Sequence, residues 1–209
     1  PQAKSMDVTS EGLCLILGAT DVALAAASDL AEMLSVTVLL SDLEAQPEDR
    51  SYDVVHGRLK TALGSLGQFE VQIDALQQRQ PGGRGQPKLT PPRDGSRTHC
   101  DILLDLTGGA PLFPAHEKRD GYLRADPSSP PAVFKAILEA SQMVGTFEKP
   151  LYVKSEPLLC AHSRAEQIGC AKCLGVCPTG AITPDGDHVT IDSMICAGCG
   201  ACAAVCPSG

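Results

Sequence analysis

The sequence CAGCGACAAVCP, from Cys196 to Pro207, decides how the end of this chain folds. It places four cysteines in the pattern C-x2-C-x2-C-x3-C-P, and the residues between them are mostly Ala and Gly. Cysteines this close cannot all pair with one another as disulfides, but three of them can occupy three corners of one compact metal cluster. Small neighbours let the backbone turn tightly around such a cluster and point N–H groups at its sulfur atoms. The fourth cysteine, which precedes Pro207, is left over from this set of three.

A second run lies upstream, in CAKCLGVCPTGAI. Here Cys170, Cys173 and Cys177 have the spacing C-x2-C-x3-C-P, which repeats the last three cysteines of the first run. The regular pattern would place a cysteine at position 167, where this chain has Gln167. The nearest upstream cysteine is Cys160, and the polar segment AHSRAEQIG between them is typical of a loop. Such a loop can bring Cys160 back to the same cluster.

Residues 160–207 resemble a bacterial-type dicluster 2[4Fe-4S] ferredoxin domain with an insertion after its first ligand. The resemblance is carried by CPTGAI and VTIDSMICAGCGACAAVCP, and it covers about the last quarter of the chain. In this family the last cysteine of each run binds the cluster of the other run. The resemblance therefore implies two [4Fe-4S] clusters, one bound by Cys160, Cys170, Cys173 and Cys206, and the other by Cys177, Cys196, Cys199 and Cys202.

The ends of the chain suggest a piece of something longer. The chain starts at Pro1 and stops two residues after Pro207. We therefore expect a fragment of a larger bacterial iron–sulfur protein, whose ferredoxin-like domain is truncated at the C-terminus. In the family, the strand after the last C-P pairs with the strand that enters the domain, here PLYVKS from Pro150. We expect this entering strand to have an unpaired edge.

Three alternatives to this ligand assignment remain open. Without Cys160, a site with three cysteines can hold a three-iron cluster. His162 can also complete the first site, because His replaces Cys on one iron of some clusters. We favour Cys160, since thiolate is the common ligand and the loop is long enough. Structural zinc also takes four cysteines, but zinc requires neither a third close cysteine nor the C-P.

The composition agrees with an intracellular metalloprotein. Of the ten cysteines, Cys14 and Cys100 are isolated and the other eight lie between Cys160 and Cys206, a clustering that suits metal binding and a reducing, cytoplasmic compartment. A net charge of −8 argues against nucleic acid as the main partner. The most apolar long stretch, residues 13–40, is interrupted by acidic residues, which argues against a membrane span.

The first part of the chain predicts an α/β domain. GLCLILGA and SVTVLLSD are apolar strand segments, and Asp21 can cap a helix over residues 22–34 between them, which gives a βαβ start and parallel pairing. Alternating apolar residues at 59–63 and 69–73 predict an antiparallel hairpin. CDILLDLTGGAPLF predicts another buried strand. Ser129 can cap a last helix, whose expected apolar face is Val133, Phe134, Ile137 and Leu138.

We therefore expect two domains. Residues 1–149 would form an α/β scaffold or docking domain with a mixed sheet. Residues 150–209 would form a small α+β ferredoxin-like dicluster domain, with a hairpin turn at Gly186 between GAI and HVTID.

The first 150 residues show no catalytic constellation. LGATDVA lies at a strand-to-helix junction but lacks G-x-G-x-x-G, and Asp21 would repel a phosphate. The histidines at positions 56, 99 and 116 share no metal-ligand or triad spacing. Cys14 and Cys100 lie in apolar segments and are expected to be inert thiols. This domain is therefore expected to have no catalytic site of its own.

The ligand pattern indicates electron transfer. A cubane bound only by cysteines has no open iron for a substrate and exchanges single electrons. The cysteine-rich region is acidic, with Lys154, Arg164 and Lys172 against Glu156, Glu166, Asp185, Asp187 and Asp192. We expect an electron-transfer protein or module that docks on a basic patch of a redox protein or oxidoreductase subunit. The alternatives are an oxidoreductase whose N-terminal domain binds a nucleotide or flavin, and clusters that only support protein recognition.

Overall fold

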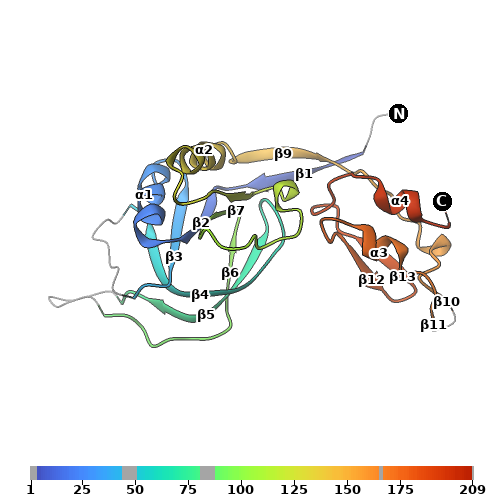
Figure 1. Ribbon diagram of the computed structural model, residues 1–209, viewed down its shortest axis with the longest axis horizontal. Helices are drawn as coiled ribbons and strands as arrows, with labels where there is room; N and C mark the ends of the chain where they lie inside the picture. Colours follow the sequence, from blue (N-terminus) through green and yellow to red (C-terminus); the bar gives the residue numbers. More distant parts are fainter. Residues whose placement is uncertain (1–3, 44–50, 81–87, 165–166, 209) are drawn as a thin grey trace. The chain divides into compact units, whose positions relative to one another are not determined.

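The structure is a computed structural model that describes residues 4–43, 51–80, 88–164 and 167–208 (Figure 1). It divides into two compact units. We call the first the α/β unit, which consists of Thr9–Pro111 and Gly121–Thr146. The second, the cysteine-rich unit, is assembled from Pro1–Val8, Leu112–Asp120 and Phe147–Gly209.

The α/β unit is built on a seven-stranded sheet, and the sheet is mixed, as the sequence predicts. The sheet has the strand order β6-β5-β4-β3-β2-β7-β8. Strand β2 (Leu13–Gly18), helix α1 (Thr20–Leu30) and strand β3 (Ser35–Leu40) form the predicted βαβ start, with β2 and β3 parallel. Strand β7 (Ile102–Leu106) pairs with the other edge of β2, also in parallel. Both central strands are apolar, because helices and neighbouring strands cover them.

The outer strands complete the mixed sheet. Strands β4 (Asp53–Leu63) and β5 (Phe69–Gln78) form the predicted antiparallel hairpin, in which Phe69 and Val71 are fully buried. Strand β6 (Ser96–Cys100) pairs antiparallel with β5, and the short strand β8 (Tyr122–Arg124) pairs parallel with β7. The sheet is therefore parallel in its centre and at β8, and antiparallel at β5 and β6.

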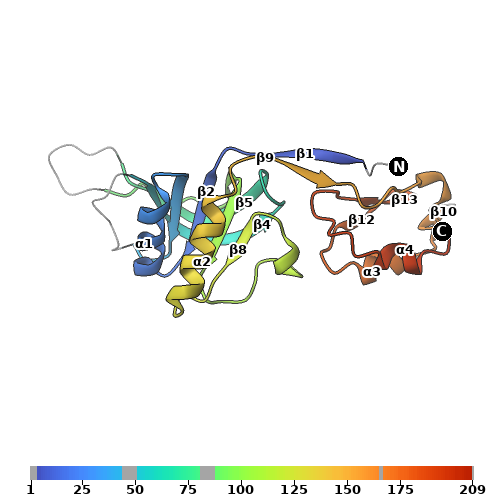
Figure 2. The ribbon, with the colours of Figure 1, turned by 90° about the horizontal axis from the view of Figure 1, so that it is seen from above.

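Two helices contact the sheet and each other, α1 on β2 and β3 and α2 (Pro130–Ser141) on β7 and β8 (Figure 2). Both differ from the prediction in detail. Helix α1 starts two residues earlier and ends four residues earlier than predicted, with Ala19 at its N-cap, so Asp21 lies in the first turn. In α2 the predicted Phe134 and Leu138 are 67% and 50% exposed, and the buried positions are Val133, Ala136, Ile137 and Ala140. Small Ala side chains let these helices lie close to their neighbours, and this decides which face is buried.

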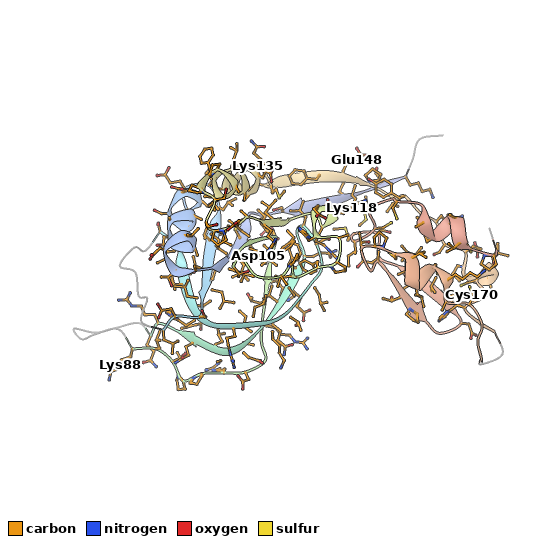
Figure 3. The ribbon with its side chains drawn as sticks, in the orientation of Figure 1. Lys88, Asp105, Lys118, Lys135, Glu148 and Cys170 are labelled. Carbon is orange, nitrogen blue, oxygen red and sulfur yellow. The ribbon has the colours of Figure 1, made fainter. Side chains whose placement is uncertain are left out.

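Two aspartates of this unit are buried, Asp101 and Asp105, and Asp105 lies deeper. Asp105 of β7 is fully buried, and Figure 3 labels it. Its carboxylate accepts hydrogen bonds from the Thr107 N–H at 3.0 Å, from the Thr107 hydroxyl at 2.6 Å and from the Tyr122 hydroxyl. Arg124 lies 3.8 Å from the same carboxylate. Because its oxygens are paired in this way, Asp105 holds the start of the Thr107–Gly108–Gly109 turn in place.

The cysteine-rich unit consists of short elements. They are the 3-10 turns η1 (His116–Lys118) and η2 (Pro157–Leu159), helices α3 (Lys172–Val176) and α4 (Ala201–Val205), and the hairpins β10 (Ser163–Arg164) with β11 (Gln167–Ile168) and β12 (Ile182–Asp185) with β13 (His188–Ile191). The predicted turn is confirmed at Gly186, which joins β12 to β13 with a φ of 58°. Each helix carries one cysteine, Cys173 in α3 and Cys202 in α4.

The predicted entering strand is wrong. Strand β1 (Ser5–Ser10) pairs with β9 (Gly145–Pro150), which ends where PLYVKS was expected to begin. Residues 151–156, all within the described part of the chain, form no strand. Only Leu151 continues the pairing, since its N–H donates to the carbonyl of Lys4 at 2.8 Å. The strand that leads into this unit thus has a partner from the start of the chain, which a ferredoxin pattern alone does not predict.

Within these described ranges, no helix combines the length and the apolar character needed to cross a membrane.

Candidate metal centre

The last cysteine run curls around a pocket because two of its glycines take left-handed backbone conformations. Gly198 has a φ of 70°, and Gly200, at the N-cap of α4, has a φ of 74°. A Cβ at Gly198 would lie only 2.6 Å from the Tyr152 ring, so the loop passes directly against this side chain. Only glycine fits both the conformation and the close approach. The small residues of the run therefore shape the loop that carries Cys196 and Cys199.

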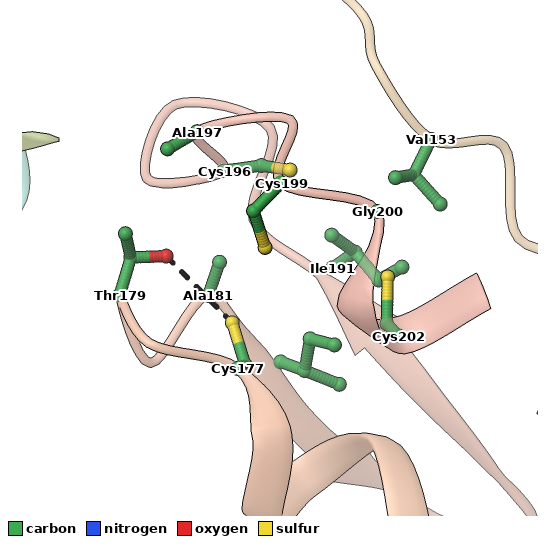
Figure 4. A pocket seen from close by; sticks show the side chains of 11 residues that line it. Val153, Cys177, Thr179, Ala181, Ile191, Cys196, Ala197, Cys199, Gly200 and Cys202 are labelled. Atoms are coloured by element: carbon green, nitrogen blue, oxygen red, sulfur yellow. Dashed lines mark hydrogen bonds between the residues drawn. The ribbon is translucent and has the colours of Figure 1, made fainter. Parts of the chain in front are cut away.

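Four thiols line this pocket together. They belong to Cys177, which follows α3, to Cys196 and Cys199 of the glycine-rich loop, and to Cys202 on α4. Figure 4 shows their sulfur atoms around a common space, with the apolar Val153 and Ile191 beside them. These are the four residues that the resemblance assigns to one cluster. The structure brings them together although Cys177 belongs to the other run.

The Cys177 thiol has the environment of a thiolate ligand. Burial alone would raise its pKa, but hydrogen bonds from the Thr179 hydroxyl and from the N–H groups of Ala181, Thr179 and Gly180 outweigh burial and lower it. The Thr179 hydroxyl lies 3.7 Å from the Cys177 sulfur. Donors aimed at a sulfur favour its charged form, which is the form that binds metal.

Three further cysteines influence the thiol of Cys173. Burial raises the pKa of the Cys173 thiol, and the neighbouring thiols of Cys170, Cys160 and Cys206 raise it further. Thiols influence one another in this way only when they lie close together. Cys206 comes from the last run and is exposed, whereas Cys160 precedes the inserted loop and is half-buried. The influence of these three thiols on Cys173 agrees with the second predicted set, in which Cys206 comes from the last run.

His162 anchors the inserted loop. The residue is buried, and its Nδ1 lies 2.7 Å from the carbonyl oxygen of Cys170, to which it donates. Its own carbonyl accepts the N–H of Gly169 at 2.6 Å and the N–H of Cys170 at 3.3 Å. A histidine that binds metal through Nε2 commonly donates its Nδ1–H to a backbone carbonyl, so this contact is compatible with either Cys160 or His162 as the fourth ligand of the Cys173 set.

The pocket fits a cluster better than a single ion. Zinc binds thiolates at about 2.3 Å, so the ligands of one zinc ion crowd around a point. Among residues 4–43, 51–80, 88–164 and 167–208, no three Cys, His, Asp or Glu side chains converge closely enough to hold a single metal ion. An iron–sulfur cluster contains several metal and sulfide atoms, so its thiolates stand farther apart and enclose a space. The pocket between Cys177, Cys196, Cys199 and Cys202 has this character.

Two residues near this pocket were missed by the sequence reasoning. Thr179 follows the C-P of the first run, and its hydroxyl is a donor that the motif does not announce. Arg119 donates from Nη2 to the carbonyl oxygen of Thr179 at 3.0 Å, from sixty residues upstream. No local sequence signal could have linked Arg119 to the cysteines, because tertiary folding alone brings them together.

The isolated cysteines and a core histidine have structural roles. Burial raises the pKa of the Cys14 thiol far above its ordinary value and that of Cys100 to about 12. Both thiols are thus protonated and unreactive at neutral pH, as predicted. The buried His56 lies 2.8 Å, through Nδ1, from the carbonyl oxygen of Asp42 and holds a loop.

Comparison with known proteins supports the class of site. Residues 168–209 match a family model described as a 4Fe-4S dicluster domain. No curated protein matches the chain. The match includes seven of the eight predicted ligands, and Cys160 lies before its first residue. The end of the chain is thus a ferredoxin-type dicluster segment, and domains of this class bind 4Fe-4S clusters and support iron–sulfur electron transfer.

Proposed function

We propose that this chain relays single electrons through two [4Fe-4S] clusters, to or from a redox partner. The observation that supports the proposal is the pocket lined by Cys177, Cys196, Cys199 and Cys202, which joins one cysteine of the first run to three of the last. A cluster in each predicted ligand set would supply reversible one-electron chemistry. The chain would supply the cysteine ligands and the hydrogen-bond donors to sulfur, and apolar side chains such as Val153 line the site.

Metal analysis tests the number of clusters. We expect about eight irons and eight acid-labile sulfides per chain after anaerobic purification, since each ligand set can hold one cubane. Reduction with dithionite should produce the EPR signals of reduced [4Fe-4S] clusters, and re-oxidation should remove them. About four irons, or zinc without sulfide, would contradict the proposal. Clusters that dithionite cannot reduce reversibly would favour a purely structural role.

Replacing Cys160 by Ala tests the crossed assignment. The Cys160→Ala variant should lose one cluster and keep the other, because only the Cys173 set depends on this thiol. Cys14→Ala is the matched control, since it also removes one cysteine but from the core of the α/β unit. If Cys160→Ala keeps all of its iron and an unchanged EPR spectrum, another residue such as His162 completes the first site.

We further propose that the redox partner docks through a basic patch. Glu156, Asp185 and Asp187 are exposed in the cysteine-rich unit. Exposed carboxylates near a redox site steer a positively charged partner surface, and this attraction weakens with salt. Residues 1–149 would act as a scaffold or docking domain beside the ferredoxin-like residues 150–209. All ten cysteines, each in the described part of the chain, are free, which supports a reducing, cytoplasmic compartment.

One observation favours an oxidoreductase role for the whole chain. In the α/β unit, the chain passes from β2 to β3 on one side of β2, and β7 pairs with β2 on the other side. The strand order therefore reverses at β2, and open α/β sheets bind ligands at such a switch point. The turn of Gly108 and Gly109 follows β7 at this edge. Flavin or nucleotide released when the purified protein is denatured would establish this role, and a protein that yields only iron and sulfide would exclude it.

A further inference from the structure

One segment of the cysteine-rich unit comes from the middle of the chain. Leu112–Asp120 follows the Gly108–Gly109 turn after β7 and precedes β8, yet it belongs to the same compact unit as the eight cysteines. It contains η1, which starts after Ala115 in a left-handed conformation with a φ of 44°. A strained backbone of this kind persists only where its surroundings fix it. The segment is therefore a specific part of the metal-binding unit.

Arg119 is the residue by which this segment reaches the cysteines. Its side chain is only 7% exposed, which is rare for an arginine without a defined role. Its guanidinium carbon lies 4.7 Å from the centroid of the Phe113 ring, and its Nη2 donates to the Thr179 carbonyl. Burial lowers the pKa of Arg119, and the charges of Asp192 and Asp120 oppose that effect. The guanidinium is thus held as a buried cation.

Thr179 transmits this contact to the Cys177 sulfur. The residue is 3% exposed, and its hydroxyl lies 3.7 Å from the Cys177 sulfur. The N–H of Gly180 donates to the carbonyl oxygen of Cys177 at 3.4 Å. Pro114 lies close to Gly180, since a Cβ on Gly180 would be 3.9 Å from its ring. Arg119 and Pro114 therefore pack on the short loop that follows this ligand.

We propose that Arg119 is a positioning residue for the cluster bound through Cys177, which it makes easier to reduce than it would otherwise be. This inference rests on the proposed function. Arg119 fixes the Thr179 carbonyl, so that the Thr179 hydroxyl stays beside the Cys177 sulfur, and it places a buried positive charge against the loop that follows Cys177. Reduction adds one negative charge to a cluster, and both effects stabilise that charge. The other cluster lacks this contact in the described structure and should be affected less.

The test is a redox titration of the full chain, followed by EPR, with variants at two neighbouring positions. Arg119→Gln removes the buried charge, and Arg119→Lys keeps a charge but loses the planar guanidinium. Lys118→Gln is the matched control. Lys118 is the residue before Arg119 and carries the same charge, but its side chain is exposed (Figure 3). Iron and sulfide are measured in every variant, so that a change in potential is separated from a loss of clusters.

We expect two steps in the titration, one for each cluster. In one of these two waves, Arg119→Gln should lower the ratio of reduced to oxidised cluster at least tenfold at a fixed potential. For one electron this is a shift of about 59 mV. The other wave should change less than twofold, and Lys118→Gln should leave both unchanged. Arg119→Lys should cause a smaller shift of the same wave. If Arg119→Gln fails to assemble its clusters, a shift of at least twofold in Arg119→Lys supports the inference.

Three results would overturn it. In the first, the Arg119 variants leave the reduction potentials of both clusters unchanged. In the second, they shift both potentials equally. In the third, Lys118→Gln shifts the same potential as strongly as Arg119→Gln. A wild-type protein without a reducible cluster at Cys177 would overturn the proposed function together with this inference. Two reducible clusters that ignore every Arg119 substitution would overturn the inference alone.

Discussion

The contact between Gly198 and Tyr152 gives the sharpest test of the metal-binding loop. Gly198→Ala places a methyl group 2.6 Å from the Cδ1 and Cγ atoms of the Tyr152 ring, far inside the usual contact distance of about 3.5–4.0 Å. It also forces a non-glycine residue into a left-handed conformation, with a φ of 70°. Gly200→Ala is the matched control. Its φ of 74° is nearly the same, but its Cβ would meet no heavy atom of the described residues within 4 Å.

The two effects can be separated by magnitude. The left-handed conformation costs about 1–2 kcal/mol for an L-residue, and both variants should show this cost. An inserted methyl group that forces its neighbours to shift costs a further 1–3 kcal/mol or so. Tyr152 is 52% exposed and can tilt outward, so we expect the lower end of that range. Gly198→Ala should therefore be about 1 kcal/mol less stable than Gly200→Ala.

Urea unfolding under anaerobic conditions measures this difference, with cluster absorbance and circular dichroism followed together. With a slope of about 2 kcal/mol per molar urea, 1 kcal/mol corresponds to a midpoint lower by about 0.5 M. Adding Tyr152→Ala to Gly198→Ala should recover the part of the loss caused by the clash, relative to Tyr152→Ala alone. Equal midpoints for the two glycine variants would refute the close approach of Tyr152 to the loop.

Two further predictions concern the α/β unit. Ile137→Ala should lower the free energy of unfolding in urea by about 2–5 kcal/mol because the side chain is buried. Leu138→Ala, on the exposed face of the same helix, should lower it by less than about 1 kcal/mol. Similar losses in the two variants would contradict the burial of this face of α2. Burial raises the pKa of Cys100 from 9.0 to about 12, so the folded state keeps a proton that the unfolded state releases. This contribution to stability is present below pH 9 and is lost as the pH rises towards 12, so Cys100→Ala should flatten the alkaline decline in unfolding free energy. If the alkaline decline is unchanged in Cys100→Ala, the pKa of Cys100 is not its cause.

The sequence predicted those features that depend on neighbouring residues. The cysteine spacings, the turn at Gly186 and the βαβ start are all short-range patterns, and the structure contains each of them. The grouping of Cys206 with Cys173 is long-range, but the family resemblance supplied it. Periodicity placed α2 almost correctly, yet it could not show that Ala136 would be buried and Phe134 exposed. That choice depends on how closely the helix approaches its neighbours, which the sequence of the helix alone does not specify.

The contribution of Arg119 could not be predicted for a different reason. Its partner is a backbone carbonyl, which every residue has, so no particular pair of side chains marks the contact. The same holds for the pairing of β1 with β9, where the start of the chain returns to the strand before the cysteines. Both contacts join segments that are far apart in sequence. A prediction based on about the last sixty residues alone therefore could not include them.

The assembly of one compact unit from three separated stretches has a consequence for synthesis. During translation the first stretch, and later Leu112–Asp120, leave the ribosome long before the cysteines that complete the unit. Neither stretch can reach its final contacts until Phe147–Gly209 has emerged, so the metal-binding unit must close after the sheet of the α/β unit has been made. Chain closure over such long sequence separations is slow. The two earlier stretches must therefore wait without their final contacts until the cysteine runs have been synthesised.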